Sequence, residues 1–353
     1  MDWQEAFRQA QKFIKDCKGQ SVHIFHDSDA DGIGAGFLLF HAVKAVGGTP
    51  AISTHTERSD ILSEEAYRAA GNVDRVIVAD INPVSNGNYD VFREVFSDTP
   101  LLVLDHHHVE EYSDALFVHS GALHGVEGSD YCTAKLAYDV TLPVLGTQFV
   151  WLAASGVLGD KNEKYFPEII SLALSQEGFD AEQDLYSSPI GAINEAIQCS
   201  QAIDNAALQA YLNDLRLCST LQEAAALGNP HPEVREAYEE LVAAADEQAS
   251  SGSCVVWVQL ASPYGISGWV SNAVSDKHRD IVLVVFKDKG DAYTMSLRLQ
   301  SRAFHLGELV GKVAQQVGGS GGGHRPAAGA KIPKKRFEEF QKLFEQEAKK
   351  LLS

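Results

Sequence analysis

Short apolar runs alternate with helical patterns over the first 160 residues. The runs at 22–25 (VHIF), 75–80 (RVIVAD) and 101–105 (LLVLD) are almost continuous, which is typical of strands buried on both faces of a sheet. A glycine-rich helical pattern over 31–48 follows the first run. Strand–helix alternation of this kind predicts an α/β fold with a doubly wound parallel sheet.

The pattern changes near residue 190 to helices rich in Ala, Glu and Gln, and strand patterns return after residue 250. We therefore predict three parts: a parallel-sheet domain over 1–195, a helical connector over 196–250 and a smaller α/β domain over 251–353. The last part is predicted to contain strands at 253–260, 280–288 and 292–300, a helix at 307–316, a low-complexity glycine-rich run at 318–332 and a closing charged helix.

Length and composition indicate an ordinary globular protein of more than one core. The chain has 353 residues, of which 45% are hydrophobic and 22% charged. No run reaches the roughly 20 apolar residues that a membrane helix needs, and the N-terminus lacks the pattern of a signal peptide. The five cysteines are scattered without a Cys-x-x-Cys pair, which favours free thiols in a reducing, cytoplasmic compartment.

Charge is unevenly distributed along the chain. The formal net charge is −19, and residues 251–353 carry 15 Lys and Arg against 9 Asp and Glu, so the excess of acid lies entirely in residues 1–250. Tight binding of long nucleic acid requires neutralisation of phosphates by cations, so this balance disfavours it. The acidic part suits cation binding, and the mildly basic part suits a phosphate.

The densest chemical feature is HDSDADGIGAG over 26–36, in which Asp27, Asp29 and Asp31 alternate between a strand and a helix. Carboxylates this close repel one another unless a cation neutralises them, and hard divalent cations prefer oxygen ligands. A helix N-cap is the simpler explanation, but it needs only one Asp. An EF-hand is excluded, because Leu38 stands where its twelfth residue must be Glu.

Further acids and histidines end the other predicted elements. Asp80 follows the second strand, the run DHHH at 105–108 follows the third, and Asp160 ends an apolar helix. Asp80 alone is equally explained as a turn residue. Three successive histidines, in contrast, are not explained by the packing of a helix or a strand. An Asp at a helix C-terminus opposes the helix dipole, which a bound cation would compensate. Because ligands sit beyond the carboxyl ends of parallel strands, we expect these groups to converge.

The glycine-rich run has a separate predicted role. Its glycines allow backbone N–H groups to approach an anion closely, and Arg298 and Arg302 can grip a phosphate or stack on a base. A flexible linker would explain the glycines but not the sequence HRPAAG that follows. The predicted substrate-binding residues are Arg298, Arg302, Gly321, Gly322, Gly323 and His324.

Five motifs follow one another between residues 26 and 329. In order, they are Asp-x-Asp-Ala-Asp-Gly, strand–Asp, Asp-His-His, Gly-x-x-Gly-Asp and Gly-Gly-Gly-His-x-x-Ala-Ala-Gly. This combination resembles the DHH superfamily of phosphoesterases with a DHH-associated C-terminal domain. Members of that superfamily include RecJ-type exonucleases, nano-RNases and cyclic-dinucleotide phosphodiesterases.

The resemblance implies two divalent metal ions, manganese rather than magnesium by preference, in the N-terminal domain. Asp27, Asp29 and Asp31 would supply the ligands of the first motif, although some relatives have histidine at the first of these positions. Asp80 would bridge both ions. His106 and Asp160 would complete the second site, His107 would lie beside the scissile phosphate, and His26 and Asp105 would support the ligands from behind. His108 has no counterpart and is assigned to the surface.

A metal pair of this kind activates water for attack on phosphorus, so no protein nucleophile is required. We find neither a Gly-x-Ser-x-Gly elbow nor a P-loop. The resemblance, together with an acidic balance that disfavours long nucleic acid, implies a phosphodiesterase that cuts dinucleotides such as pGpG, or short oligonucleotides, to nucleoside monophosphates. Alternatives are a RecJ-type single-strand exonuclease, a cyclic-dinucleotide phosphodiesterase, a 3′,5′-bisphosphonucleoside phosphatase and a nucleotide sensor without catalysis. The expected partner is a short nucleotide, with no membrane and no stable complex with long nucleic acid; a homodimer is left open.

Overall fold

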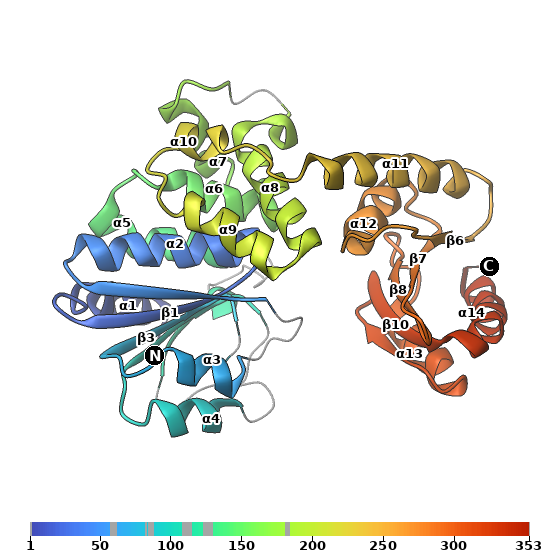
Figure 1. Ribbon diagram of the computed structural model, residues 1–353, viewed down its shortest axis with the longest axis horizontal. Coiled ribbons are helices and arrows are strands. Elements are labelled where there is room, and N and C mark those ends of the chain that lie inside the picture. Colours follow the sequence, from blue (N-terminus) through green and yellow to red (C-terminus); the bar gives the residue numbers. More distant parts are fainter. Residues whose placement is uncertain are drawn as a thin grey trace. The chain divides into compact units, whose positions relative to one another are not determined.

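The structure is a computed structural model that describes residues 2–56, 62–81, 83, 88–107, 115–122, 130–180 and 184–352. His108 lies outside the described residues. The chain divides into two compact units: an N-terminal unit of Met1–Ser200 and Asp204–Pro230, and a C-terminal unit of Gln201–Ile203 and His231–Ser353. Both are shown in Figure 1. The five cysteines are free thiols.

The N-terminal unit is built on a five-stranded parallel sheet. Its order is β2-β1-β3-β4-β5, and every neighbouring pair is parallel. The predicted runs form the three central strands, which are almost wholly buried. The strands are β1 (Ser21–Asp27), β2 (Thr49–His55), β3 (Arg75–Ala79), β4 (Leu101–Asp105) and β5 (Leu116–His119).

Helices cover both faces of this sheet, as Figure 1 shows for α2 on one side and for α3 and α4 on the other. Successive strand residues point to opposite faces, so Ile24 joins the core beneath α1, α2, α5 and α6, whereas Phe25 joins the core beneath α3 and α4. The predicted doubly wound α/β fold is therefore confirmed. These helices are α1 (Trp3–Lys15), α2 (Ala30–Ala45), α3 (Glu64–Ala69), α4 (Asn88–Val95), α5 (Thr133–Leu145) and α6 (Val150–Gly159).

The segment predicted as a helical connector is divided between the units. Leu208 and Leu221 of this segment pack in the larger core of the N-terminal unit, and α11 belongs to the C-terminal unit. The helices that follow α6 are α7 (Pro167–Gln176), α8 (Pro189–Ile203), α9 (Asn205–Leu215), α10 (Leu221–Ala226) and α11 (Pro232–Ala249). Among the described residues, no helix is both long and apolar enough to cross a membrane.

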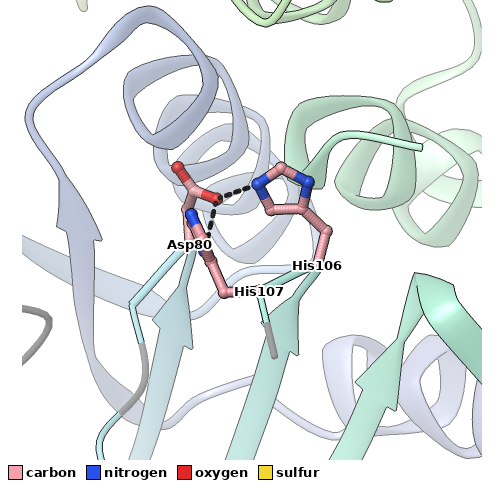
Figure 2. Close-up of side chains that lie close together, drawn as sticks. All are labelled: Asp80, His106 and His107. Carbon is pink, nitrogen blue, oxygen red and sulfur yellow. Dashed lines mark ion pairs between the residues drawn. The ribbon is translucent and has the colours of Figure 1, made fainter. Parts of the chain in front are cut away.

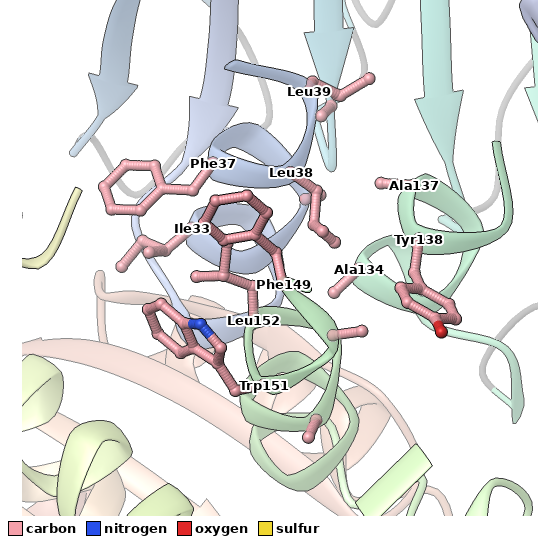
Figure 3. Packing of buried hydrophobic residues seen from close by; sticks show 14 of the residues in the cluster. Ile33, Phe37, Leu38, Leu39, Ala134, Ala137, Tyr138, Phe149, Trp151 and Leu152 are labelled. Carbon is pink, nitrogen blue, oxygen red and sulfur yellow. The ribbon is translucent and has the colours of Figure 1, made fainter. Parts of the chain in front are cut away.

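Helices α2, α5 and α6 meet in a tightly packed core, shown in Figure 3 with Ile33 and Phe37 of α2 against Trp151 and Leu152 of α6. Glycine permits this approach: a Cβ added at Gly34 would lie 2.5 Å from the carbonyl oxygen of Leu152. Interiors packed at this density resist displacement. The N-termini of α2 and α5 are thereby fixed in space.

The C-terminal unit contains a smaller, mixed sheet of order β6-β7-β8-β10-β9, in which only β6 and β7 are parallel. The predicted smaller α/β domain is therefore present. Its strands are β6 (Val255–Gln259), β7 (Val282–Asp288), β8 (Ala292–Arg298), β9 (Ser320–Gly323) and β10 (Ala327–Pro333). Its remaining helices are α12 (Ser267–Lys277), α13 (Leu306–Gln316) and α14 (Phe337–Leu352).

The glycine-rich run forms β9 and β10 instead of an irregular segment. A Cβ at Gly307 would lie 2.1 Å from the carbonyl oxygen of Gly323, and one at Gly321 would lie 2.8 Å from the side chain of Val310. Helix α13 therefore packs directly on the backbone of β9. Small residues are needed here for packing as well as for any contact with an anion.

Candidate metal centre

The first acidic motif joins the end of β1 to the start of α2. Asp29 is the N-cap of α2, and its Oδ1 accepts hydrogen bonds from the N–H groups of Asp31 and Gly32, each at 2.9 Å. Asp31 is buried, and its two carboxylate oxygens accept the N–H groups of Thr133 and Ala134, each at 2.7 Å. One aspartate thus serves as the cap, and the motif still contains two further carboxylates.

Asp80 follows β3 in an unusual backbone conformation. Its φ is 62°, in the left-handed region that residues other than glycine rarely adopt. The residue is 4% exposed, and its Oδ1 accepts a hydrogen bond from the Thr133 hydroxyl at 2.8 Å. Strain of this kind persists where the surrounding structure enforces it, most often at functional sites.

The Asp-His-His turn after β4 is organised by its own aspartate. Asp105 is fully buried, and its Oδ1 accepts the N–H groups of His106 (2.8 Å) and His107 (3.1 Å) and pairs with His107 Nδ1 at 2.9 Å. His119, at the end of β5, contacts the His107 carbonyl oxygen through Nε2 at 2.5 Å. The aspartate predicted to support the histidines therefore contacts both of them.

The histidine rings meet carboxylates from three other segments. His106 Nε2 lies 3.5 Å from Asp80 Oδ1 and 3.9 Å from Asp31 Oδ2, and His106 Nδ1 lies 3.6 Å from Asp160 Oδ2. Figure 2 shows the rings of His106 and His107 directed at the same oxygen of Asp80; the His107 distance is 3.8 Å. These spacings are longer than good hydrogen bonds, and they suit ligands that each lie about 2.1 Å from a shared cation.

Three overlapping groups of these side chains have ligand atoms within 4.8 Å of one another: Asp80 with His106 and His107, Asp31 with His106 and Asp160, and Asp27 with Asp29 and Asp80. Two of the groups share Asp80 and two share His106. The structure therefore brings together all six side chains predicted as metal ligands, and His107 lies beside them. Carboxylate and imidazole donors without a thiolate fit Mn²⁺ or Mg²⁺.

The electrostatics of the cluster also fit a cation. Burial, followed by the neighbouring Asp29, raises the pKa of Asp27 to about 7 and that of Asp31 to about 6. Burial and then Asp31 raise the pKa of Asp160 to about 7, and burial with four nearby carboxylates raises the pKa of Asp80 well above its usual range. A nearby positive charge would favour the ionised form of each of these carboxyl groups and lower its pKa.

This crowding makes metal affinity depend on pH. Below about pH 7 the metal-free carboxyl groups with raised pKa hold protons, and a cation must displace them. We therefore expect the apparent Mn²⁺ affinity to rise between about pH 6 and pH 8, with protons released on binding. Calorimetric titrations in buffers of different ionisation enthalpy measure both effects; an affinity that is constant over this range would contradict the prediction.

His26 lies behind the cluster and is fully buried. Its Nδ1 contacts the carbonyl oxygen of Asp27 at 2.6 Å, and its Nε2 contacts the Thr54 hydroxyl at 3.2 Å. Burial lowers its pKa to about 4, so the ring is neutral. A Cβ at Gly36 would lie 2.6 Å from the ring. The contacts of His26 thus support the backbone that carries Asp27.

Several residues at the centre were not identified from the sequence. The Thr133 hydroxyl and the N–H groups of Thr133 and Ala134 bind Asp80 and Asp31. Asn162 accepts the Cys132 N–H at 2.9 Å and donates to the Asp160 carbonyl oxygen at 3.1 Å. Every residue except proline has a backbone N–H group, so the sequence does not indicate which of these groups bind a carboxylate. A Thr at the start of a helix is usually interpreted as a capping residue.

The predicted substrate-binding residues lie on β8 and β9 of the C-terminal unit and on the segments that follow these strands. Arg298 ends β8, its Nε donates to Asn272 Oδ1 at 2.6 Å, and burial lowers its pKa. Gly321–Gly323 belong to β9, an edge strand. His324 and Arg302 are exposed, and the Arg325 guanidinium, which the sequence did not single out, donates to the Arg302 carbonyl oxygen at 3.5 Å.

Comparison with known proteins agrees with this architecture. Residues 253–350 match the DHHA1 domain, and no curated protein matches the chain. Similar structures include Mn²⁺-bound RecJ from Thermus thermophilus (TM-score 0.71, 17% identity, 98% of this chain and 55% of that chain) and a manganese-bound exonuclease RecJ (0.69, 16%, 97% and 94%). A third is the pGpG-specific phosphodiesterase PggH from Vibrio cholerae (0.55, 15%, 93% and 99%).

The expected fold is confirmed over nearly the whole chain by these structures, and residues 253–350 match the DHHA1 domain. At these identities the likeness concerns the fold. The chain spans about half the length of the Thermus RecJ. Divalent cations are present in the similar RecJ structures, with Mn²⁺ in two and Mg²⁺ in another from Thermus.

Proposed function

We propose that the chain is a metal-dependent phosphodiesterase that hydrolyses dinucleotides such as pGpG, or short linear oligonucleotides, to nucleoside monophosphates. The observation that carries the proposal is the convergence of Asp31, Asp80 and Asp160, from three separate segments, on His106 from a fourth. Each carboxylate has an oxygen within 3.9 Å of a ring nitrogen of His106. The DHHA1 domain and the fold shared with RecJ and PggH support it.

In the proposed site, Asp27, Asp29, Asp31, Asp80, His106 and Asp160 hold two divalent cations. Such ions supply Lewis-acid activation of water and neutralise charge on the phosphoryl oxygens. The protein holds the carboxylates in fixed orientations, because Asp29, Asp31, Asp80 and Asp105 each accept hydrogen bonds from neighbouring groups.

His107 is suited to contact the reacting phosphate. Its hydrogen bond to Asp105 raises its pKa to about 9, so the imidazolium persists at neutral pH. Nδ1 is occupied by Asp105, which leaves the Nε2 edge to donate to a phosphoryl oxygen. The side chain is 54% exposed, so a substrate can reach it. A charged donor beside a phosphate stabilises the negative charge that builds up on its oxygens.

We propose that the C-terminal unit recognises a phosphate or a base of a nucleotide. Arg298 and His324 would contact a phosphate or a base, with Gly321–Gly323 offering backbone N–H groups from an edge strand. Arg302 and Arg325 lie close by. Recognition of one phosphate or base by these residues would favour short nucleotides as substrates. The net charge of −19 is consistent with that preference, because it disfavours long nucleic acid.

A RecJ-type exonuclease is the second candidate, and the observation that favours it is the higher TM-score with RecJ than with PggH. We expect kcat/KM with Mn²⁺ to be about tenfold or more higher for pGpG than for single strands of about 20 nucleotides. Product chromatography on linear, cyclic and bisphosphorylated substrates measures this. Faster hydrolysis of the long single strands than of pGpG would identify an exonuclease. Release of free phosphate would identify a phosphomonoesterase, and nucleotide binding without turnover would identify a sensor.

A further inference from the structure

The N-terminus of α5 contacts three of the segments that form the metal centre. The Thr133 and Ala134 N–H groups donate to Asp31, and the Cys132 N–H donates to Asn162 Oδ1. Asn162 in turn donates to the backbone of Asp160. Cys132 is the N-cap of α5 but makes no side-chain cap hydrogen bond. The Asp31 carboxylate from α2 therefore does what a capping side chain usually does.

The Thr133 side chain adds a contact with a third segment, the one that follows β3. Its hydroxyl donates to Asp80 Oδ1 at 2.8 Å across 53 positions of sequence. Thr133 has no exposed surface, and Asp80 is 4% exposed. Water therefore cannot readily replace this hydrogen bond, and a buried carboxylate that loses a donor is strongly penalised.

We propose that Thr133 is a positioning residue of the metal centre, whose hydroxyl sets the orientation of the Asp80 carboxylate while its N–H sets that of Asp31. The proposal rests on the proposed function, because it takes both carboxylates to be metal ligands. One residue then fixes the relative placement of carboxylates from two motifs that are 49 positions apart. Partners of metal ligands typically change metal affinity or activity by about 10- to 100-fold.

The test is Mn²⁺ binding to the metal-free protein, with no substrate present. Thr133→Val removes the hydroxyl and keeps the N–H and nearly the same volume. We expect its Mn²⁺ affinity, measured by calorimetry, to fall by about 10- to 100-fold. We also expect the electron paramagnetic resonance signal of a coupled manganese pair to weaken. Thr133→Ser keeps the hydroxyl and is expected to restore both readouts, and Thr133→Ala should repeat the loss without a methyl group facing Asp80.

Thr141→Val is the matched control, because Thr141 lies on the same helix and is fully buried. Its hydroxyl contacts only carbonyl oxygens of its own helix, those of Ala137 at 2.8 Å and Tyr138 at 3.3 Å. This variant should leave Mn²⁺ affinity unchanged. Wild-type affinity and signal in Thr133→Val and Thr133→Ala would overturn the proposal, and so would equal losses in Thr133→Val and Thr141→Val. A wild-type protein that binds no Mn²⁺ would overturn the proposed function itself, a result that is distinguishable from either.

Discussion

Asp80→Asn is expected to reduce hydrolysis by about a thousandfold or more, because the carboxylate that two of the ligand groups share loses its charge. Asparagine has almost the same shape, and its Oδ1 can still accept the Thr133 hydroxyl. The loss should therefore come from metal binding rather than from a collapsed site. Steady-state kinetics with Mn²⁺ and calorimetric titration of the metal-free variant measure the two effects.

The same substitution should leave the metal-free protein at least as stable as the wild type. Burial and four neighbouring carboxylates raise the pKa of Asp80, which shows that its ionised form is unfavourable in the folded protein without a cation. Removing that charge relieves the repulsion. Thermal unfolding at pH 8 with a chelator tests this, and Asp98→Asn, an exposed aspartate in the same unit, is the control. Unimpaired hydrolysis in Asp80→Asn would contradict the assignment of the centre.

The fold was predictable where burial makes the sequence pattern unambiguous. β1, β3 and β4 are central strands whose residues are nearly all buried, so they appear as continuous apolar runs. β2 (TPAISTH) has exposed positions, and β5 has only four residues, so neither stands out. β9 and β10 were missed because glycine and alanine have low strand propensity. Their conformation is set by pairing with β8 and by packing of α13.

The candidate site was predictable to the extent that its ligands are side chains at the ends of strands. Asp27, Asp80 and Asp105 each end or follow a buried strand, and the parallel order of the sheet brings them to one edge. The groups that hold these carboxylates in place could not be predicted. They are N–H groups and a hydroxyl at the start of α5, whose position depends on the packing of three helices.

Gly156→Ala is expected to test that packing directly. A Cβ on Gly156 of α6 would lie 2.3 Å from the Ala134 Cβ and 2.9 Å from Asp31 Oδ1, closer than nonbonded atoms tolerate. It would therefore press on the hydrogen bond between the Ala134 N–H and Asp31 Oδ1. We expect the free energy of unfolding to fall by about 1–3 kcal/mol. We also expect kcat to fall by about 10- to 100-fold, because Asp31 is displaced.

Gly268→Ala separates this steric effect from the general effect of alanine in a helix. Gly268 is a helical glycine of α12, and an added Cβ there meets no atom within 4 Å. Alanine favours helices over glycine by up to about 1 kcal/mol, so this variant should be as stable as the wild type or more stable, with unchanged kcat. Denaturant unfolding measures the free energy of unfolding of both variants, Mn²⁺ titration measures their metal affinity, and steady-state kinetics measures their kcat. If Gly156→Ala behaved like Gly268→Ala, helix packing would not set the position of Asp31, and its placement would depend on the α2 backbone alone.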